Sequence, residues 1–408
     1  MSGDDAVVRV LFLTQYFTPE ITAAPVRLHP FAAGLAARGH EGEVVCEVPS
    51  HPQGVVYDGF GRRRVESREL DGFRVTYVWT YARPSKRPRH RLASYASYAG
   101  VASAVASARR RPDVVLASSP PLSVGAAGAL VAKRHRAPFA LDVRDLWPEV
   151  AVALGELSPG PVLRAAEVLE RRLYANAALV TTPTEPFCRH IAALSPDPSR
   201  AQVVANGTTR RWLEAGEAEV PRPGNVARAF VWTYAGNVGL SQDLETAIEA
   251  ARILGSGFEL RIAGEGARRE SLAEQARATP EARVRFEGLV EPDAAARLLR
   301  GSDALLVSLA DDEALAKSIP IKLYDYCAIG RPVIVAATGE VRRIADAEGV
   351  ADTLDPGDPR ALAETVRRLR DDPGRGAELA ARARDFAARN LRERGVERLE
   401  ALLRGIAR

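Results

Sequence analysis

Short apolar segments alternate with longer segments of helical spacing along this chain, and the alternation runs through the sequence twice. Residues 7–16 and 113–119 are apolar runs in the first half, and residues 230–235 begin the second series. Uninterrupted apolar runs are typical of strands that are buried on both faces of a parallel sheet. Strands that alternate with helices in this way predict doubly wound α/β domains, so we expect two of them.

The boundary between the two series lies in a region where charged residues, Gly and Pro replace the periodic apolar pattern. We predict a Rossmann-like N-terminal domain over residues 1–213, a linker over residues 214–228 and a Rossmann-like C-terminal domain over residues 229–390. A chain of 408 residues is also too long for one ordinary core and suits two α/β domains.

Composition places the chain among globular proteins and limits the kinds of partner that we expect it to bind. The net charge of +4 and the pI near 9.0 suit a polyanionic ligand or an anionic surface, and no nucleic-acid motif accompanies them. Cys46, Cys188 and Cys327 are far apart and odd in number, so neither a disulfide framework nor a zinc site is expected. We expect a cytoplasmic protein, because neither a signal peptide nor an apolar run of about 18 residues is present.

The segment from Arg83 to Arg91 contains six basic residues in nine positions, counting His90. One interpretation is a solvated basic loop. The other is a patch for anionic lipid head groups, to which each Lys or Arg near the surface contributes about 1 kcal/mol. Such a patch would place the protein on the inner face of the membrane and would suit an acceptor carried on a polyprenyl diphosphate.

The stretch from Lys317 to Pro332 has the most specific pattern in the chain. Pro320 is suited to the start of a helix, and Gly330 is suited to its end. The helix N-terminus and Lys322 would meet a phosphate, while Asp325 could accept hydrogen bonds from ribose hydroxyls. A nucleotide site and a plain surface helix with a solvated Lys and Asp are both open on this spacing alone.

Residues 318–334, Ser-Ile-Pro-Ile-Lys-Leu-Tyr-Asp-Tyr-Cys-Ala-Ile-Gly-Arg-Pro-Val-Ile, resemble the P-x-K-x-x-E-Y-x-A-x-G-x-P-V-I stretch of the family 4 glycosyltransferases. The resemblance extends from residue 7 to about residue 370. Arg-Asp-Leu-Trp-Pro-Glu at 144–149 is similar to the branch that builds bacterial surface polysaccharides, of the colanic-acid and O-antigen type. The resemblance implies a GT-B fold, in which two Rossmann-like domains face each other across a cleft and a C-terminal helix, here 391–408, returns to the first domain.

The resemblance assigns the nucleotide-sugar donor mainly to the second domain. It implies that Lys322 meets the diphosphate and that Asp325 holds the ribose, while Lys317 stands where the family has a further acid. A glycine turn would let the backbone approach the phosphates closely. The expected donor-binding residues are Gly236, Asn237, Val238, Gly239, Gly264, Glu265, Gly266, Gly288, Leu289, Ile321, Lys322, Leu323 and Asp325.

Acceptor recognition is expected at loops that follow the strands of the first domain. The resemblance implies retention of anomeric configuration by front-face attack, a UDP-linked donor, and neither a metal nor another cofactor. Catalytic candidates are Asp145, Glu149, Glu340 and Lys322. For Arg144 and Asp145 the alternative is an ion pair between them that only fixes the loop. The expected acceptor residues are Tyr16, Glu20, Thr22, Ala23, Arg27, Arg144 and Trp147.

Two other functions remain open at this point. A non-hydrolysing sugar-nucleotide 2-epimerase shares the GT-B architecture, but no clear set of acid and base residues for it is seen. An inactive nucleotide-sugar-binding subunit is suggested by departures from the family pattern at Thr22, at Lys317 and at Ser241 with Gln242. Lys322 and Asp325 argue against an inert protein, and hydrolysis of donor in the absence of acceptor would separate the two.

Overall fold

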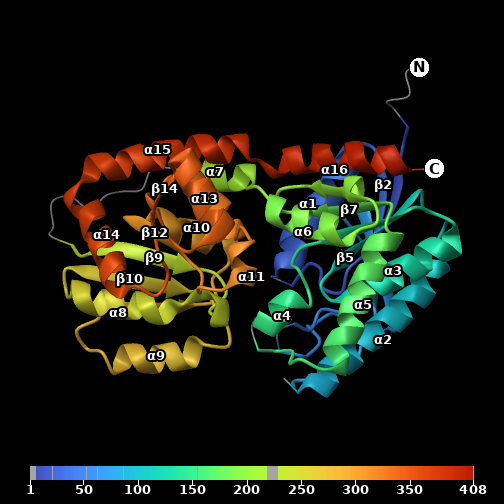
Figure 1. The fold of residues 1–408 in the computed structure, drawn as a ribbon, viewed down its shortest axis with the longest axis horizontal. Helices are drawn as coiled ribbons and strands as arrows, with labels where there is room; N and C mark the ends of the chain where they lie inside the picture. The colour runs from blue at the N-terminus through green and yellow to red at the C-terminus, as the bar shows by residue number, and fades with distance from the viewer. Residues whose placement is uncertain are drawn as a thin grey trace. The chain divides into compact units, whose positions relative to one another are not determined.

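The chain forms two compact units, each an α/β domain (Figure 1). The first unit comprises Met1–Asn206 with Glu393–Arg408, and the second comprises Gly207–Arg392. This computed structural model describes residues 6–20, 22–51, 53–61, 63–85, 87–153, 155–217 and 228–407. The sheet order in both units confirms the prediction of two doubly wound domains.

The sheet of the first unit contains eight strands among the described residues, in the order β3-β4-β2-β1-β5-β6-β7-β8. β3 pairs antiparallel with β4, and the other neighbours pair in parallel. The strands are β1 (Arg9–Leu13), β2 (Glu41–Glu47), β3 (Val65–Leu70), β4 (Phe73–Val78), β5 (Val114–Ser119), β6 (Phe139–Val143), β7 (Leu179–Thr182) and β8 (Ala201–Val203). The helices are α1 (Ala23–Ala37), α2 (Pro88–Ser107), α3 (Leu122–His135), α4 (Glu149–Ala153), α5 (Pro161–Asn176), α6 (Glu185–Leu194), the short η1 (Pro198–Arg200) and α16 (Arg392–Ile406).

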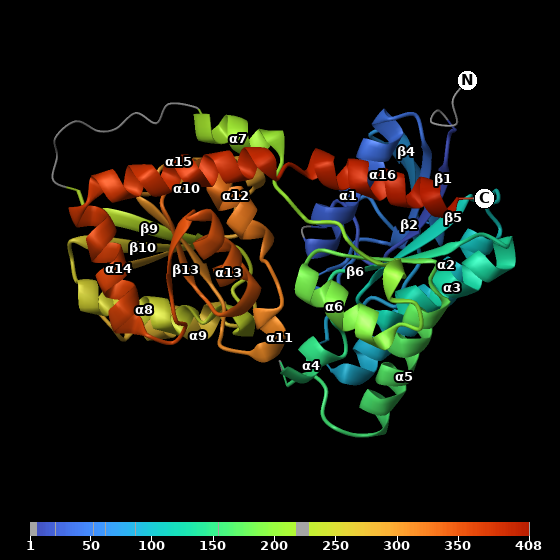
Figure 2. The same cartoon turned by 45° about the horizontal axis from the view of Figure 1, so that its top comes forward.

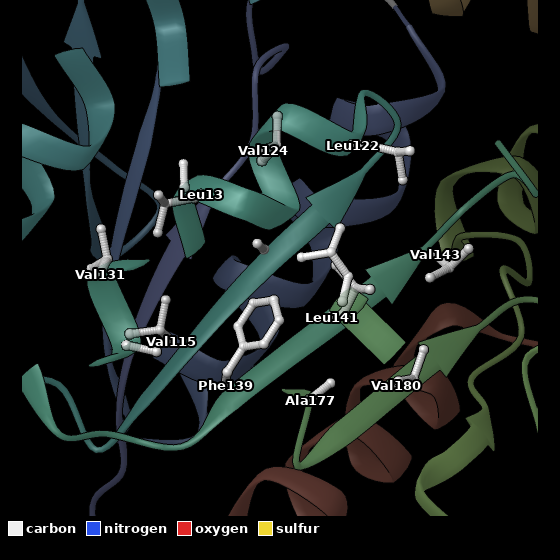
Figure 3. Packing of buried hydrophobic residues seen from close by; sticks show 14 of the residues in the cluster. Leu13, Val115, Leu122, Val124, Val131, Phe139, Leu141, Val143, Ala177 and Val180 are labelled. Carbon is white, nitrogen blue, oxygen red and sulfur yellow. The ribbon is translucent and has the colours of Figure 1, made fainter. Parts of the chain in front are cut away.

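Each face of this sheet has its own core because side chains alternate along every strand. In β1, Leu11 and Leu13 pack with helices α2, α3, α5 and α6, whereas Val10 and Phe12 pack with α1 and α16. Figure 3 shows the first of these cores, where side chains from β5, β6 and β7 meet those of α3. Burial on both faces explains why the strands read as continuous apolar runs.

The sheet of the second unit contains six parallel strands among the described residues, in the order β11-β10-β9-β12-β13-β14. Figure 2 shows β9, β10 and β13 of this sheet. The strands are β9 (Phe230–Ala235), β10 (Phe258–Ala263), β11 (Val284–Gly288), β12 (Ala304–Ser308), β13 (Val333–Ala336) and β14 (Ala351–Leu354). The helices are α7 (Arg210–Glu217), the short η2 (Leu240–Gln242), α8 (Leu244–Leu254), α9 (Arg269–Arg277), α10 (Pro292–Arg300), α11 (Glu313–Ala316), α12 (Ile321–Ile329), α13 (Gly339–Glu348), α14 (Pro359–Asp371) and α15 (Pro373–Arg389).

This second sheet is also covered on both faces. Leu306 of β12 packs in the core with α8, α9 and α14, whereas Leu305 and Val307 pack in the core with α10, α12, α13 and α15. The second of these cores holds α12 firmly, because Leu323, Cys327 and most other residues of that helix are buried.

The expected linker over residues 214–228 differs from the structure at its start. Residues 210–217 form α7, which packs against α10 and α12 and therefore belongs to the second unit. The first unit accordingly ends at Asn206 instead of residue 213. Residues 218–227 lie outside the described residues.

Candidate functional site

Strand order marks one place in each sheet where ligands bind in doubly wound folds. In the first sheet, β1 has β2 on one side and β5 on the other, so the chain changes direction across the sheet between β1 and β5. In the second sheet, β9 has β10 on one side and β12 on the other, so the change lies between β9 and β12. Adjacent carboxyl ends at such a switch point leave a crevice for ligands. The candidate sites are therefore the loops that follow β1 and β5 in the first unit and those that follow β9 and β12 in the second.

Lys322 is held at the carboxyl end of β9. Its Nζ donates a hydrogen bond to the Tyr234 hydroxyl and lies 3.8 Å from the centroid of the Tyr234 ring. The hydroxyl in turn donates to the Asn237 carbonyl oxygen at 2.6 Å. A Cβ on Gly236 would lie 3.0 Å from the Lys322 Nζ, so the lysine rests directly against the glycine turn. Burial lowers the pKa of Lys322 to about 7.

Asp325 lies one turn further along α12, with two partners from distant parts of the same unit. Its Oδ1 accepts a hydrogen bond of 2.8 Å from the Thr208 hydroxyl and lies 3.9 Å from Arg392 Nη2. Burial raises the pKa of Asp325 to about 6, although Arg392 and Thr208 both act to lower it. Thr208 also pairs with Leu391 in a short parallel bridge, which brings these partners together.

The glycine turn does not present its amides in the predicted way. The N–H groups of Gly236 and Val238 donate to Ala263 O and Glu265 O, each at 2.9 Å, and Gly239 N–H donates to Gln242 Oε1 at 3.0 Å. These three amides have acceptors within the protein, and the expectation that they bind a diphosphate stays a prediction.

Close packing of two loops explains the glycines that follow β10. A Cβ on Gly264 would lie 1.9 Å from Gly236 O, and a Cβ on Gly266 would lie 2.3 Å from Val238 O. Real Cβ atoms do not approach this closely, and Gly264 also has a φ of +130°. Both residues are therefore required for the loop after β10 to pack on the turn after β9.

The remaining predicted donor residues occupy different environments. The Leu323 side chain is buried in the core and its N–H donates to Pro320 O at 3.0 Å, so neither group is available to a donor. Glu265 forms an ion pair of 3.0 Å with Arg269. Leu289 is 66% exposed and Ile321 is half-buried, while the Gly288 carbonyl oxygen accepts a hydrogen bond from Gly264 N–H at 2.7 Å.

Glu340, a predicted catalytic carboxylate, lies in the first turn of α13. It is buried, and its two oxygens accept hydrogen bonds of 2.6 and 2.8 Å from Arg343 of the same helix. A Cβ on the preceding Gly339 would lie 2.0 Å from Ala316 O, so the start of α13 is packed tightly on α11. Lys317 ends α11 at this point.

Arg27, a predicted acceptor residue, is turned into the first unit. Its guanidinium donates to both Asp142 oxygens, and its Nη1 donates to Val204 O and Asn206 Oδ1, each at 2.8 Å. Both members of the Arg27–Asp142 pair are almost completely buried. Burial alone would raise the pKa of Asp142, but Arg27 and Thr181 lower it below its usual range. The expected contact of Arg27 with an acceptor does not fit this geometry, because the side chain stabilises the fold.

Tyr16, Arg144 and Asp145 gather at the carboxyl ends of β1 and β6. Arg144 donates to the Ser118 hydroxyl at 2.9 Å and to Pro120 O at 2.6 Å, which fixes the loop after β5. Burial raises the pKa of Asp145 while Arg144 opposes the rise. Burial lowers the pKa of Arg144, and the carboxylates and Tyr16 raise it. Arg144 therefore fixes this loop through Ser118 and Pro120, while its expected contact with an acceptor and the alternative ion pair with Asp145 stay predictions.

Glu20 connects two loops at the same edge. Its Oε1 accepts hydrogen bonds of 2.8 Å from the backbone N–H groups of Ser50 and His51, which follow β2. Burial raises the pKa of Glu20 to about 7 despite these bonds. Burial and the nearby Glu20 also raise the pKa of Glu47, a buried carboxyl group that sequence reasoning missed. Glu47 sits within β2, where no pattern of spacing distinguishes it.

The other predicted residues of the first unit lie at helix starts. Thr22 caps α1 and Ala23 begins it, without a side-chain hydrogen bond at the cap. Trp147 packs partly against the core, and Glu149 begins α4, where its carboxylate lies 3.7 Å from His190 Nδ1.

The described residues contain neither a cluster of metal ligands nor a helix that could cross a membrane. In that part of the chain, no three side chains of His, Cys, Asp or Glu gather as a metal site would need. Its helices are all too short or too polar to cross a membrane.

Both halves of the chain match known family models. A glycosyl transferase 4-like domain matches residues 22–207, and a glycosyl transferases group 1 domain matches residues 229–372. WcaI of Escherichia coli (strain K12), which is named for colanic acid biosynthesis, is 26% identical over 412 residues. The alignment covers 96% of this chain and 98% of WcaI.

Solved structures give the same fold. HepE from Anabaena, solved in complex with UDP-glucose, is 16% identical with a TM-score of 0.71, covering 97% of this chain and 98% of HepE. Sucrose-phosphate synthase from Thermosynechococcus elongatus is 15% identical with a TM-score of 0.77, covering 98% of each chain. With both domain models matched in order, the chain belongs to the GT-B glycosyltransferases that join a 4-like domain to a group 1 domain.

Proposed function

We propose that this glycosyltransferase moves a sugar from a UDP-linked donor to a hydroxyl of a saccharide, lipid-linked or small-molecule acceptor. One observation carries the donor half of the proposal. Lys322, an enclosed lysine, lies at the switch point of the second sheet one turn before Asp325. A diphosphate beside the lysine and a ribose beside the carboxylate would match this spacing.

The proposed chemistry needs charge stabilisation on the departing diphosphate. Lys322 supplies positive charge there, and the N-terminus of α12 adds its dipole. We propose that the reaction retains anomeric configuration by front-face attack, in which the leaving phosphate accepts the proton of the acceptor hydroxyl. No metal cofactor is part of this proposal, because the charge is balanced by the lysine and the helix. Asp145, Glu149 and Glu340 remain the candidates for an assisting carboxylate.

The acceptor half of the proposal rests on the first unit. Tyr16, Glu20 and Trp147 lie in loops or helix starts that follow the strands of this sheet. Within the basic segment, Arg83, Arg87 and Arg89 are exposed, and Lys86 lies outside the described residues.

Exposed apolar side chains accompany this basic segment. Leu92 is 57% exposed at the start of α2, and Trp79 is 48% exposed at the end of β4. Basic and apolar groups together suit an anionic membrane surface. We therefore propose peripheral binding to such a surface, where a lipid-linked acceptor would be presented.

A thermal-shift panel tests the donor site first. UDP-, GDP- and dTDP-sugars are added to the wild type, to Lys322→Ala and to Lys133→Ala, which removes an exposed lysine in the last turn of α3. We expect one nucleotide class to raise the Tm of the wild type and of Lys133→Ala, because a ligand that binds only the native state stabilises it. Lys322→Ala should lose most of the shift.

The result also separates the enzyme from an inert binder. No shift with any donor at millimolar concentration would contradict the donor site. If a donor binds, release of free UDP from it in the absence of acceptor should be slow but measurable, and should vanish in Lys322→Ala. Binding without any release or transfer would favour a nucleotide-sugar-binding subunit.

A further inference from the structure

Lys322 is one of the few lysines in a chain whose cationic residues are almost all arginines. The sequence has 56 lysine and arginine residues, of which four are lysines: Lys86, Lys133, Lys317 and Lys322. A guanidinium stays charged even when it is enclosed, whereas an amine can lose its proton. A lysine at this position can therefore exist without an anionic partner until one arrives.

Tyr234 contacts the Lys322 amine with both its ring face and its hydroxyl group. The Nζ lies 3.8 Å from the ring centroid, where a cation is attracted to the aromatic face. The hydroxyl proton of Tyr234 is directed to the Asn237 carbonyl oxygen at 2.6 Å, so the hydroxyl oxygen accepts from Lys322. Tyr234 is itself almost completely buried in the core that also holds α8, and its position is fixed.

We propose that Tyr234 is a positioning residue for donor binding: its ring and hydroxyl hold the Lys322 amine at the carboxyl end of β9, ready for the diphosphate. The inference rests on the proposed function. The phosphate oxygens then take the place of an ion-pair partner, and Lys322 takes up a proton from solvent as the ligand binds.

The surroundings of Lys322 fit this arrangement. The titratable groups that touch Lys322 or share its helix are Tyr234 from β9 and, on α12 itself, Tyr324, Asp325, Tyr326 and Cys327. α7, α10, α15 and β12 pack against α12. Among the described residues, none of these elements supplies a charge that shifts the pKa of Lys322, and burial alone lowers it. A bound anion favours the charged form and should raise this pKa, which gives proton uptake near pH 8.

The test uses protein labelled with ¹³C at the lysine Cε positions, which gives four signals. Lys→Arg variants of Lys86, Lys133 and Lys317 assign them. The Lys322 signal is titrated from about pH 4.5 to pH 10 in the wild type, in Tyr234→Phe and in Tyr326→Phe. Tyr326→Phe is the matched control, because in the described part of the chain the Tyr326 hydroxyl hydrogen-bonds the backbone of Ala235, at 2.7 and 2.9 Å, and not Lys322.

Tyr234→Phe should lower the pKa of Lys322 by about one unit, because the lost hydroxyl stabilised the charged form. UDP or pyrophosphate should raise that pKa in the wild type. The Kd for UDP, measured by calorimetry at pH 8, should be about tenfold higher in Tyr234→Phe and nearly unchanged in Tyr326→Phe. Calorimetry in buffers of different ionisation enthalpy should show proton uptake in the wild type.

Other results would overturn the inference in distinguishable ways. If UDP binds and raises the pKa of Lys322, but Tyr234→Phe leaves both pKa and Kd unchanged, the positioning role is wrong and the donor site stands. Equal losses in Tyr234→Phe and Tyr326→Phe would show a general structural effect, which also contradicts the inference. If neither UDP nor pyrophosphate perturbs Lys322 in the wild type, the proposed donor site fails together with this inference.

Discussion

Lys322 and Asp325 lie three residues apart on α12, and burial lowers the pKa of the lysine and raises that of the carboxyl group. Their partners Tyr234, Thr208 and Arg392 come from distant segments. No local pattern distinguishes such partners, because the fold alone brings them within reach of a hydrogen bond or an ion pair.

Asp325→Asn should separate stability from binding. Burial raises the pKa of Asp325 to about 6, so the folded protein binds a proton more tightly than the unfolded chain does. The protonated Asp325 carboxyl group therefore favours folding at low pH, and this contribution to the free energy of unfolding is lost as pH rises from about 4 to about 6. At pH 8 the buried carboxylate is charged and lowers the stability of the folded protein. Asn carries no charge and retains an acceptor for Thr208.

We expect the Tm of Asp325→Asn to exceed that of the wild type at pH 8, and the difference to shrink below pH 6. UDP binding should weaken, because a carboxylate is the stronger acceptor for ribose hydroxyls. Thr208→Val serves as a control, since it removes the hydrogen bond of 2.8 Å and leaves the charge. A lower Tm for Asp325→Asn at pH 8 would contradict the prediction.

At the scale of elements, apolar runs predicted the buried strands well and the exposed ones poorly. β5, β9 and β12 are buried on both faces and stand out as apolar runs. β3 was not predicted, because this edge strand is mostly exposed and its sequence is polar. α7 was not predicted, and its residues were divided between the first domain and the linker. Tertiary packing against α10 and α12 supports a helix that its sequence alone does not indicate.

Gly264→Ala tests why the turn after β9 has its shape. The added Cβ would lie 1.9 Å from Gly236 O, so the two loops must separate. We expect a loss of stability of about 1–3 kcal/mol, as for other overpacked sites. Gly255→Ala is the control, because Gly255 also has a positive φ, +73°, but nothing within 4 Å.

Gly255→Ala should cost about 1 kcal/mol and leave UDP binding unchanged. Gly264→Ala should also weaken UDP binding, because Gly236 lies against the Lys322 Nζ. Urea unfolding followed at each domain and calorimetric binding provide the two measurements. Equal stability losses in the two variants would show that backbone strain, and not the close approach of the loops, requires glycine at position 264.

For the molecule as a whole, the last helix is distant in sequence from the domain that it completes. Val396, Leu399 and Leu403 of α16 are buried in the core that contains α1 and β1. A Cβ on Gly34 of α1 would lie 2.7 Å from the Val396 side chain, so the two helices are in close contact. The family resemblance implied both a C-terminal helix and its place on the first domain, and no local pattern in the chain indicates that place.

Leu399→Ala should therefore destabilise the first unit selectively. Truncation of a buried leucine costs about 2–5 kcal/mol, because a cavity remains. Hydrogen exchange read by mass spectrometry should show faster exchange in peptides of α1 and β1, and unchanged exchange in peptides of β9 and β12. Leu130→Ala, on an exposed position of α3, is the control and should change neither. Faster exchange confined to β9 and β12 would mean that α16 stabilises the second unit, which its buried contacts with α1 and β1 argue against.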